Sequence, residues 1–414
     1  MKNNRKPEFE TAFSYGLSGG LSDGQLRKLQ VTALRVLDEI GVELGNAALR
    51  DALAGQAGVR VDGMRVKLPP PLVDRLVDEH RRTRPVPMPP GDEFLVQVLA
   101  GYAFQVAELG SEKLRPMTTE ECVRQARIVE GLRGRGVRGG APGLPQDVPA
   151  HLREILAYKI ALENNRDPGW PSFSGWESGR IMLDMAEAAG QGAGLSIFLL
   201  SPLMIEGSTV DMAVELIGRG SKLPLGLCNM PLIGATAPVH LPAAYVESTA
   251  TMLAAFTAFK LLGAGIGVCP MLFPFDLRTG IVAYGTPAHI HAWLMSDQIC
   301  RFYNNGNGQW CCTAFHTTSV FPDAHAVTTR TAFASVGALH GARRFGFGGW
   351  LSLDKVYSPE MLVIDTEIVD YLKHVVAPIP FTEETLGFEI LKEVGPRGEF
   401  LTHDSTLAEC RKQW

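Results

Sequence analysis

Four of the six tryptophans lie near the ends of short apolar runs: Trp170, Trp176, Trp310 and Trp350. The face of an indole ring attracts a cation, and the attraction is worth about 2 kcal/mol or more when the pair is shielded from water. A group of such rings suits an organic cation that cannot donate a hydrogen bond. The alternative is that these rings only pack loops against the body of the protein.

Other side chains at the same predicted strand ends could complete a binding site for a small molecule. They are aromatic, amide or imidazole groups: Phe173, Asn229, Tyr303, Asn305, His316 and Phe347. No lysine falls at a predicted strand end, which argues against a Schiff-base enzyme. The first predicted strand carries no His-x-His pair and no carboxylate cluster is present, which argues against a two-metal hydrolase. A glycine-rich nucleotide motif is also missing. The inventory therefore favours binding by ring faces and amides.

Four cysteines form a second candidate site, because they also stand near predicted strand ends. They are Cys228, Cys269, Cys311 and Cys312. Thiolates with an open coordination position could hold a catalytic zinc that activates a thiol or alkyl acceptor. No C-x-x-C spacing supports this reading, and a free cysteine is commonly a small buried apolar residue. We therefore expect no tightly bound metal, with these four residues as the alternative.

The elements that must position these residues follow from a repeated pattern after residue 95. Short apolar runs ending in Gly, Pro or Asn alternate with segments of helical periodicity. Eight strand–helix units with uniformly apolar strands indicate an α/β fold, a (β/α)8 or TIM barrel, whose active site lies at the carboxyl ends of the strands. An open doubly wound sheet is the alternative. The predicted strands are Phe104–Leu109, Val137–Pro142, Trp170–Trp176, Leu195–Leu203, Leu223–Met230, Gly265–Leu272, Phe302–Gly308 and Phe345–Leu351.

The pattern divides the 414 residues into three parts. Residues 1–95 are predicted to form a mainly helical N-terminal domain with a small hairpin at Asp62–Gly63, because Asp-Gly between alternating residues favours a tight turn. Ser22 is placed to cap a helix that stops at Gly41. Residues 96–376 are expected to form the barrel, and residues 377–414 a C-terminal extension.

Composition excludes several classes of protein. With 39 basic and 44 acidic side chains the net charge is −5, which argues against a nucleic-acid partner. Seven scattered cysteines and no secretory segment at the start favour a reduced, cytoplasmic protein. Residues 250–275 are strongly apolar, but Lys260, several glycines and two prolines interrupt them. We interpret that stretch as a buried helix and a buried strand, and expect no contact with a membrane.

An ordered set of short motifs resembles the trimethylamine methyltransferase family, including its members that lack pyrrolysine and demethylate glycine betaine and related quaternary amines. The motifs run from about residue 21 to 403, and it is the ordered set that is specific. They are Leu21–Val42, Arg115–Thr118, Asp147–Pro149, Ser201–Leu203, Gly234–Pro238, Asp276–Gly280, Pro322–Ala324, Leu362–Asp365, Val394–Pro396 and Phe400–His403.

The resemblance implies a TIM-barrel enzyme that moves a methyl group from an amine nitrogen to the cobalt of a cobalamin. A separate corrinoid protein would carry that cobalamin and dock over the barrel mouth. Since Co(I) is itself the nucleophile, the barrel's task is to orient and desolvate the ammonium. In this reading Glu206 or Asp276 stabilises the cation. If the substrate carries a carboxylate, Arg278 or the amides of the loop after the seventh predicted strand hold it. We also expect a homo-oligomer.

The segment from Trp310 to Phe321 departs from the trimethylamine enzymes, because it contains only standard residues where they read pyrrolysine. His325 also stands where we expect glutamine. The missing pyrrolysine favours a betaine-like quaternary amine over trimethylamine, while His325 and the Cys311-Cys312 pair leave the exact amine open. Two alternatives stay open: a zinc-thiolate alkyltransferase with a thiol acceptor, and a barrel that binds a quaternary amine without reacting.

Overall fold

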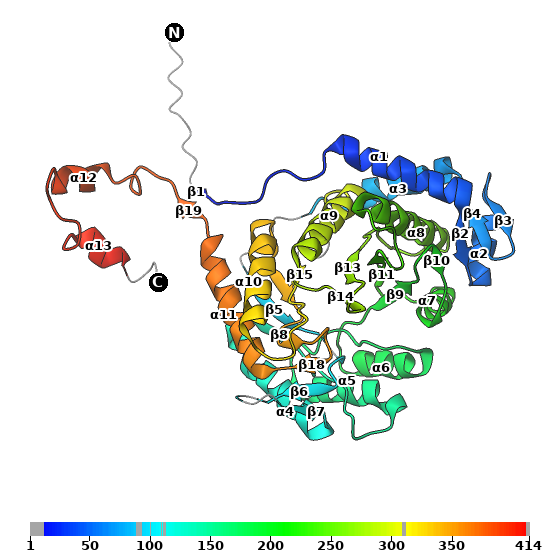
Figure 1. Ribbon diagram of the computed structural model, residues 1–414, viewed down its shortest axis with the longest axis horizontal. Coiled ribbons are helices and arrows are strands. Elements are labelled where there is room, and N and C mark those ends of the chain that lie inside the picture. The colour runs from blue at the N-terminus through cyan, green and yellow to red at the C-terminus, as the bar shows by residue number, and fades with distance from the viewer. Residues whose placement is uncertain are drawn as a thin grey trace, which may run out of the picture. The chain divides into compact units, whose positions relative to one another are not determined.

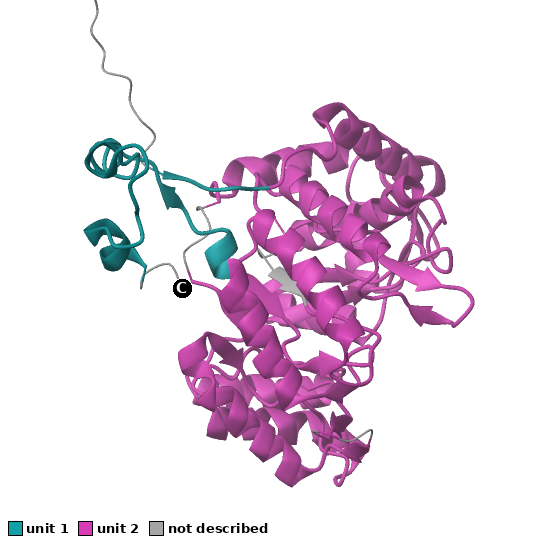
Figure 2. Cartoon of the chain, turned by 60° about the vertical axis from the view of Figure 1, so that its left-hand side comes forward, with its two compact units in different colours: residues 1–16, 373–414 teal, residues 17–372 magenta. Residues whose placement is uncertain are grey.

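The computed structural model describes residues 12–87, 93–99, 101–108, 110, 113–308 and 312–410. The chain divides into two compact units (Figure 2). One unit comprises residues 1–16 and 373–414, and the other comprises residues 17–372. The three-part division at residues 95 and 376 that the sequence suggested stays a prediction.

The first elements of residues 17–372 follow from local capping chemistry. Helix α1 (Asp23–Arg35) begins after Ser22, whose hydroxyl accepts the Gln25 N–H while the Gln25 side chain accepts the Ser22 N–H. The helix continues through one π-helical turn (Val36–Ile40) and ends at Gly41, where φ is 83°. The predicted cap and stop are therefore both confirmed.

The predicted hairpin at Asp62–Gly63 is also confirmed. Strands β3 (Arg60–Asp62) and β4 (Arg65–Lys67) pair antiparallel, and β2 (Val42–Leu44) adds to β4. Strand β10 (Met204–Ile205) then pairs parallel with β2, which ties this sheet to the later part of the chain. The accompanying helices are α2 (Ala47–Ala54) and α3 (Pro70–Thr83).

The rest of this unit is a mixed α/β structure, in which short strands lie inside an arc of helices (Figure 1). The helices are α4 (Thr119–Gly131), α5 (Arg153–Asn164), α6 (Trp176–Ala188), α7 (Ser208–Gly218), α8 (Leu241–Leu261), α9 (Pro287–Tyr303), α10 (Ala324–Leu339) and α11 (Pro359–Val375). The strands are β5 (Leu95–Val98), β6 (Gln105–Ala107), β7 (Leu114–Pro116), β8 (Val137–Gly139), β9 (Leu195–Leu199), β11 (Leu225–Asn229), β12 (Leu232–Ile233), β13 (Phe273–Asp276), β14 (Ile281–Val282), β15 (Cys312–Ala314), β16 (Arg344–Gly346), β17 (Trp350–Leu351) and β18 (Val356–Tyr357).

Parallel pairing dominates the central strands. Four of them form the parallel sheet β15–β16–β5–β8, while β9 pairs with β11 and β12 pairs with β13. Within the part of the chain that the structure describes, these sheets do not join into a closed ring. The α/β class is therefore confirmed, and the closed barrel stays a prediction.

Four predicted strands are recovered in shortened form, as β8, β9, β11 and β16. The first predicted strand, Phe104–Leu109, is wrong as a member of the parallel sheet. Its strand β6 belongs to a different sheet, where it pairs antiparallel with β7 and parallel with β18. The place beside β8 and β16 belongs to β5.

Three other predicted strands are also wrong. Phe302–Gly308 contains the end of helix α9 and a turn, and the strand comes later, at β15. Trp170–Trp176 forms no strand and runs directly into α6. Gly265–Leu272 is irregular and buried at alternate positions, and β13 begins only at Phe273. In Phe302–Gly308 and Gly265–Leu272 the apolar residues mark burial without fixing the type of element, whereas Trp170 is 44% exposed.

Helix α8 forms the centre of the core. Residues 247–259 are all buried, and its apolar side chains cover every side of the helix, as expected for a helix surrounded by other elements. This confirms the buried helix predicted in the apolar stretch from residue 250. Among the described residues, no helix has both the length and the hydropathy needed to span a membrane.

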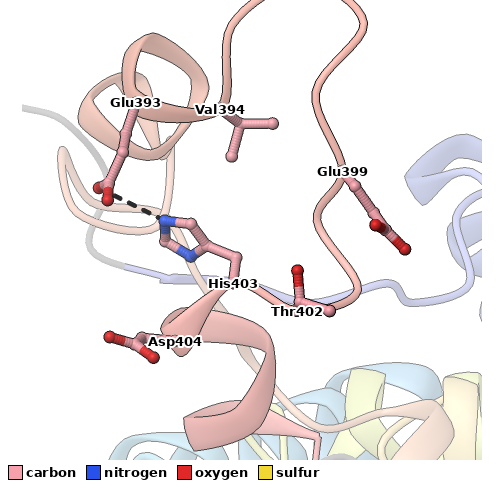
Figure 3. Close-up of a pocket in the computed structure, with 6 residues that line it drawn as sticks. All are labelled: Glu393, Val394, Glu399, Thr402, His403 and Asp404. Carbon is pink, nitrogen blue, oxygen red and sulfur yellow. Dashed lines mark ion pairs between the residues drawn. The ribbon is translucent and has the colours of Figure 1, made fainter.

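The smaller unit holds the strand pair β1 (Ala12–Phe13) and β19 (Ile379–Pro380), followed by α12 (Phe388–Val394) and α13 (Asp404–Glu409). An open pocket of about 420 Å³ lies between these two helices (Figure 3). Its wall includes an ion pair in which His403 Nε2 lies 3.4 Å from a Glu393 carboxylate oxygen.

Candidate functional site

A chain of touching aromatic rings lies where several parallel strands end. We call it the aromatic cluster, and its members are Tyr102, Phe273, Tyr284, His316, Phe347 and Trp350. Tyr102, His316 and Phe347 follow β5, β15 and β16, which are parallel neighbours. Because the carboxyl ends of parallel strands meet at one edge, these three rings come together there.

The ring contacts are continuous. The Tyr102 and Trp350 centroids are 5.5 Å apart, and Trp350 lies 5.1 Å from Phe347. Phe347 is 4.0 Å from His316, which stacks on Tyr284 at 4.2 Å. These separations are typical of edge-to-face and stacked pairs that hold one another in fixed orientations.

Exposure divides the cluster into a buried floor and an outer face. Trp350 is fully buried, and Tyr284 and His316 are each less than a tenth exposed. Tyr102 is 43% exposed and Phe347 is half-buried. The faces that a ligand can reach are therefore those of Tyr102 and Phe347, with Trp350 behind them.

A carboxylate stands beside this cluster. Asp354 Oδ1 lies 3.0 Å from His316 Nδ1, so the ionised carboxylate accepts a hydrogen bond from that nitrogen. Asp354 lies in the turn between β17 and β18, where Ser352, Leu353 and Asp354 all have φ between 51° and 68°. Such left-handed conformations are unfavourable for residues with a Cβ and persist only where surrounding contacts fix them.

The same turn is anchored through its backbone. The Ser352 N–H donates to the Ser319 carbonyl at 2.7 Å, and the Leu353 N–H donates to the Thr317 carbonyl at 3.1 Å. Both acceptors belong to the segment that carries His316. The turn and this segment therefore hold Asp354 and His316 against each other.

A buried ion pair supports the cluster from behind. Arg330 on α10 and Asp365 on α11 are both fully buried, with 2.5 Å between Arg330 Nη1 and Asp365 Oδ2. The same carboxylate oxygen accepts the Gly349 N–H at 2.7 Å, and Arg330 also donates to the Trp350 carbonyl. The pair thus fixes the backbone on which Trp350 is mounted.

The structure brings three of the predicted binding residues into the cluster: His316, Phe347 and Trp350. Asn229 is buried and its amide is already engaged, since it donates to the Ser248 hydroxyl and accepts the Met271 N–H. Asn229 therefore has no free amide group to offer a substrate, and its predicted binding role gains no support.

Other predicted binding residues lie elsewhere. The Trp170 ring covers Gly194, just before β9, and so lies at the amino end of that strand. Trp176 begins α6, with the Arg219 guanidinium 5.3 Å above its ring, and lines a pocket of about 400 Å³ between α6 and α7. Phe173 is buried against Gly179 of α6.

Two further predicted residues belong to the end of α9. Tyr303 is buried beside Arg81, whose guanidinium lies 5.6 Å from the ring. The Asn305 amide donates to the Arg84 carbonyl at 2.9 Å. Both were predicted on a strand that the structure replaces with a helix and a turn.

The two predicted catalytic carboxylates, Asp276 and Glu206, have contacts outside the aromatic cluster. Asp276 accepts the Arg278 N–H at 2.9 Å, and this hydrogen bond holds the pKa of Asp276 below its usual value. The Arg278 side chain is 91% exposed. Glu206 lies against Gly45, in the loop after β10. The catalytic and substrate-binding roles of these residues stay predictions.

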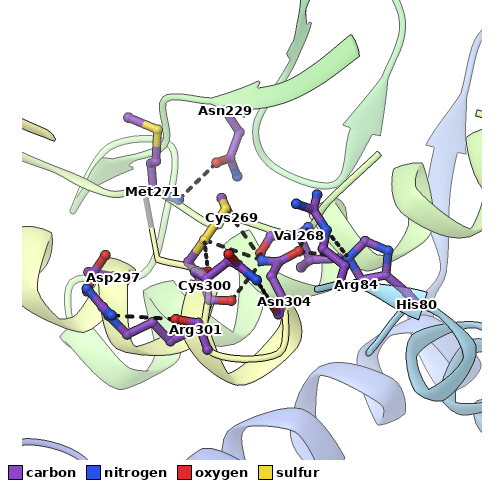
Figure 4. Close-up of a disulfide and its surroundings, with 12 residues drawn as sticks. His80, Arg84, Asn229, Val268, Cys269, Met271, Asp297, Cys300, Arg301 and Asn304 are labelled. Atoms are coloured by element: carbon purple, nitrogen blue, oxygen red, sulfur yellow. Dashed lines mark hydrogen bonds and ion pairs between the residues drawn. A yellow bond between two sulfur atoms is a disulfide. The ribbon is translucent and has the colours of Figure 1, made fainter. Parts of the chain in front are cut away.

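The four cysteines considered as an alternative metal site are not all available as thiolates. Cys269 is joined to Cys300 by a disulfide, beside the Asn304 amide (Figure 4). The expectation of reduced thiols is therefore wrong for this pair, and Cys269 is not available as a metal ligand. Cys228 is free, and burial raises its pKa to about 11.

Two predicted residues, Trp310 and Cys311, lie outside the described residues, and of Cys312 only the place in β15 is described. In the described ranges, no three His, Cys, Asp or Glu side chains are grouped so that they could hold a metal ion.

Sequence reasoning missed Tyr102, Tyr284 and Asp354. Tyr102 and Tyr284 follow strands that the sequence analysis placed wrongly. Asp354 is a polar residue in a turn, and no spacing in the sequence links it to His316. Only the apolar run ending near Leu351, which predicts a strand end there, could have drawn attention to the turn that follows.

Residues 18–414 match the family described as trimethylamine methyltransferase (MTTB). The chain belongs to this family and is a methyltransferase, which confirms the expectation from the sequence. Trimethylamine methyltransferase MttB of Desulfitobacterium hafniense DCB-2 is 23% identical, over 96% of this chain and 83% of the relative. Glycine betaine methyltransferase of D. hafniense Y51 is 21% identical, over 95% and 85%. The Methanosarcina barkeri monomethylamine methyltransferase structure (MtmB) is 12% identical with a TM-score of 0.42, over 91% of this chain and 87% of that one.

Proposed function

We propose that this protein takes a methyl group from a quaternary, betaine-like amine and delivers it to cobalamin on a partner corrinoid protein. The aromatic cluster is the observation that carries the proposal. Its outer rings, Tyr102 and Phe347, offer faces to a cation that has no N–H to donate. Family membership supports the transfer of a methyl group, and the substrate class is proposed from the rings.

The parallel strands and intervening helices support the proposal that the strands close into a (β/α)8 barrel. In that fold the carboxyl ends of the strands form the active-site face. Tyr102, His316 and Phe347 follow such ends, and two of the rings are partly exposed. A methyl group held there faces outward, where a docked partner can reach it. This arrangement suits a cobalamin that arrives on another protein.

The chain's own contribution is to hold and orient the substrate. Cobalamin, when present, supplies the Co(I) nucleophile. Tyr102 and Phe347 contact the methylated nitrogen, while buried Trp350 fixes the Phe347 ring from behind. The departing amine is neutral, so this chain needs no general acid. Holding the ammonium in one orientation and away from water lowers the barrier without further chemistry from the protein.

The zinc-thiolate alternative loses support because Cys269 is held in a disulfide. The sequence-based expectations of a homo-oligomer and a cytoplasmic location stay predictions. A protein that binds the amine without reacting is distinguished by the assay below.

The proposal is tested by incubating the anaerobic protein with chemically reduced Co(I) cobalamin and a panel of betaines and trimethylamine. The formation of methylcobalamin is followed by absorbance. We expect methylation from one or more quaternary amines and little from trimethylamine. Saturable binding without methylation, either from free cobalamin or with a corrinoid protein, would identify a binding protein and refute the proposed transfer.

A pair of variants tests the location of the site. Phe347→Ala removes a ring of the outer face and should weaken amine binding by about 0.5–2 kcal/mol. Trp176→Ala removes a ring that the structure places on α6 beneath Arg219, and should leave affinity unchanged. The opposite result would restore the sequence-based prediction for Trp176 and move the site away from the aromatic cluster.

A further inference from the structure

A carboxylate in direct contact with the aromatic cluster comes from a turn that sequence reasoning did not single out. Asp354 contacts His316 at 3.0 Å, and its side chain is 19% exposed. Its neighbour His316 touches both Tyr284 and Phe347. Asp354 is therefore one hydrogen bond away from the centre of the aromatic cluster, and it is shielded from most of the solvent.

The charge of Asp354 is felt on both sides of His316. Burial is the main reason that the pKa values of Tyr102 and Tyr284 are raised, and the negative charge of Asp354 raises both further. The two tyrosines lie at different places along the cluster, one beside Trp350 and one beside His316. Both tyrosines therefore lie within the field of Asp354, and at Tyr102 the charge of Glu154 acts in the same direction.

The backbone around Asp354 adopts a conformation that is unfavourable in free energy and is held by surrounding contacts. Three consecutive residues with a Cβ adopt left-handed conformations, and each of them costs of order 1 kcal/mol. If the Asp354 side chain had no role, this turn could adopt a more favourable conformation or contain glycine at these positions. The hydrogen bonds from Ser352 and Leu353 to the His316 segment hold the turn in this conformation.

We propose that Asp354 is the specificity-determining residue for positive charge in the substrate. Ring faces also make favourable apolar contacts with an uncharged group of the same shape, so rings alone discriminate weakly. A partly shielded carboxylate attracts the cation by Coulomb interaction and has no such attraction for the neutral group. This role rests on the proposed function, and it replaces Glu206 and Asp276 as the counter-charge.

The test compares two ligands that differ only in charge at one atom. Glycine betaine carries a trimethylammonium group, and 3,3-dimethylbutanoate carries a carbon in place of that nitrogen. Calorimetric titration of the full chain should show a clear preference for glycine betaine. In Asp354→Asn, which keeps an oxygen beside His316, we expect that preference to fall about tenfold, with affinity for the carbon analogue little changed.

Three further variants complete the design. Asp354→Glu keeps the charge and should restore most of the preference. Asp51→Asn alters an exposed carboxylate on α2 and should change nothing. Asp276→Asn tests the earlier candidate directly. Each variant is first compared with the parent protein by its thermal transition, so that only folded variants are titrated.

The outcomes separate the two proposals. A parent protein that binds neither compound and methylates cobalamin from no amine of the panel overturns the proposed function, and the role of Asp354 with it. If another betaine of the panel is the substrate, the same comparison is made with that betaine and its own carbon analogue. Binding of both compounds with equal affinity by the parent protein overturns the role of Asp354 alone. So does a preference that survives in Asp354→Asn, or one that is lost in Asp276→Asn instead.

Discussion

Replacing Asp365 by asparagine should be one of the most damaging conservative changes in this protein. Asp365 and Arg330 are both fully buried, and the ion pair between them is 2.5 Å long. Asparagine has nearly the same shape and can still accept the Gly349 N–H, but it leaves the guanidinium without a counter-charge. Removing one partner of a buried pair typically costs about 3–5 kcal/mol, so we expect the free energy of unfolding to fall by that amount.

Helix α11 also provides a matched control. Asp370 pairs with Arg135 at 2.7 Å, but both side chains are about half exposed. Asp370→Asn should therefore cost less than about 1 kcal/mol. Urea unfolding followed by tryptophan fluorescence measures both variants, with equal slopes and shifted midpoints expected. Equal losses for the two variants would refute the reasoning that burial makes the charge of Arg330 costly.

The double variant Arg330→Met with Asp365→Leu separates charge from packing. It removes both charges together and fills the space with apolar side chains. Since a buried pair gains little over a well-packed apolar replacement, this variant should be more stable than Asp365→Asn. A double variant that is as unstable as Asp365→Asn would show instead that the hydrogen bonds to Gly349 and Trp350 dominate.

Two further predictions concern buried groups of the same unit. Burial lowers the pKa of His289 to about 3, and His316 adds to the effect. In the unfolded chain the His289 imidazole is protonated below about pH 6.5, whereas in the folded protein it stays neutral. The free energy of unfolding is therefore highest above that pH. It decreases as the pH falls towards 3, by at most about 1.4 kcal/mol per pH unit. His289→Phe, which retains a ring against Phe333, should flatten that part of the pH profile of the urea midpoint, and an unaltered slope would argue against a neutral buried histidine. Reduction of the denatured protein should expose two more reactive thiols, and Cys269→Ala with Cys300→Ala should cost about 3–4 kcal/mol because the disulfide spans 31 residues. A thiol count that reduction does not alter would contradict the disulfide.

Local chemistry explains which elements could be predicted. The cap at Ser22, the stop at Gly41 and the Asp62–Gly63 hairpin each depend on a few adjacent residues, and all three are confirmed. Buried apolar runs are different, because such a run predicts only that the segment is buried and does not predict its secondary structure. Phe302 and Tyr303 are apolar at the end of a long helix, and the sequence alone could not distinguish that from a strand.

The site shows the same division. Phe347 and Trp350 were found because they follow a strand whose position was predicted well. Trp170 and Trp176 were included only because a strand was assumed between them. Asp354 reaches His316 through a hairpin that pairs with β6, more than two hundred residues earlier in the chain. Such a contact depends on the register of distant strands, which no local pattern records.

The hairpin β17–β18 connects the stability and the specificity of this site. One end is fixed by Asp365 and Arg330 through Gly349 and the Trp350 carbonyl, and its turn presents Asp354 to His316. If the hairpin moves as one body, Asp365→Asn should also reduce the preference for glycine betaine over its carbon analogue, at temperatures where the variant stays folded. In a double-mutant cycle, Asp354→Asn should then add little to that loss, giving a coupling above about 0.5 kcal/mol. Additive effects would show that the two ends of the hairpin act independently, and that the buried ion pair supports the fold without positioning the carboxylate.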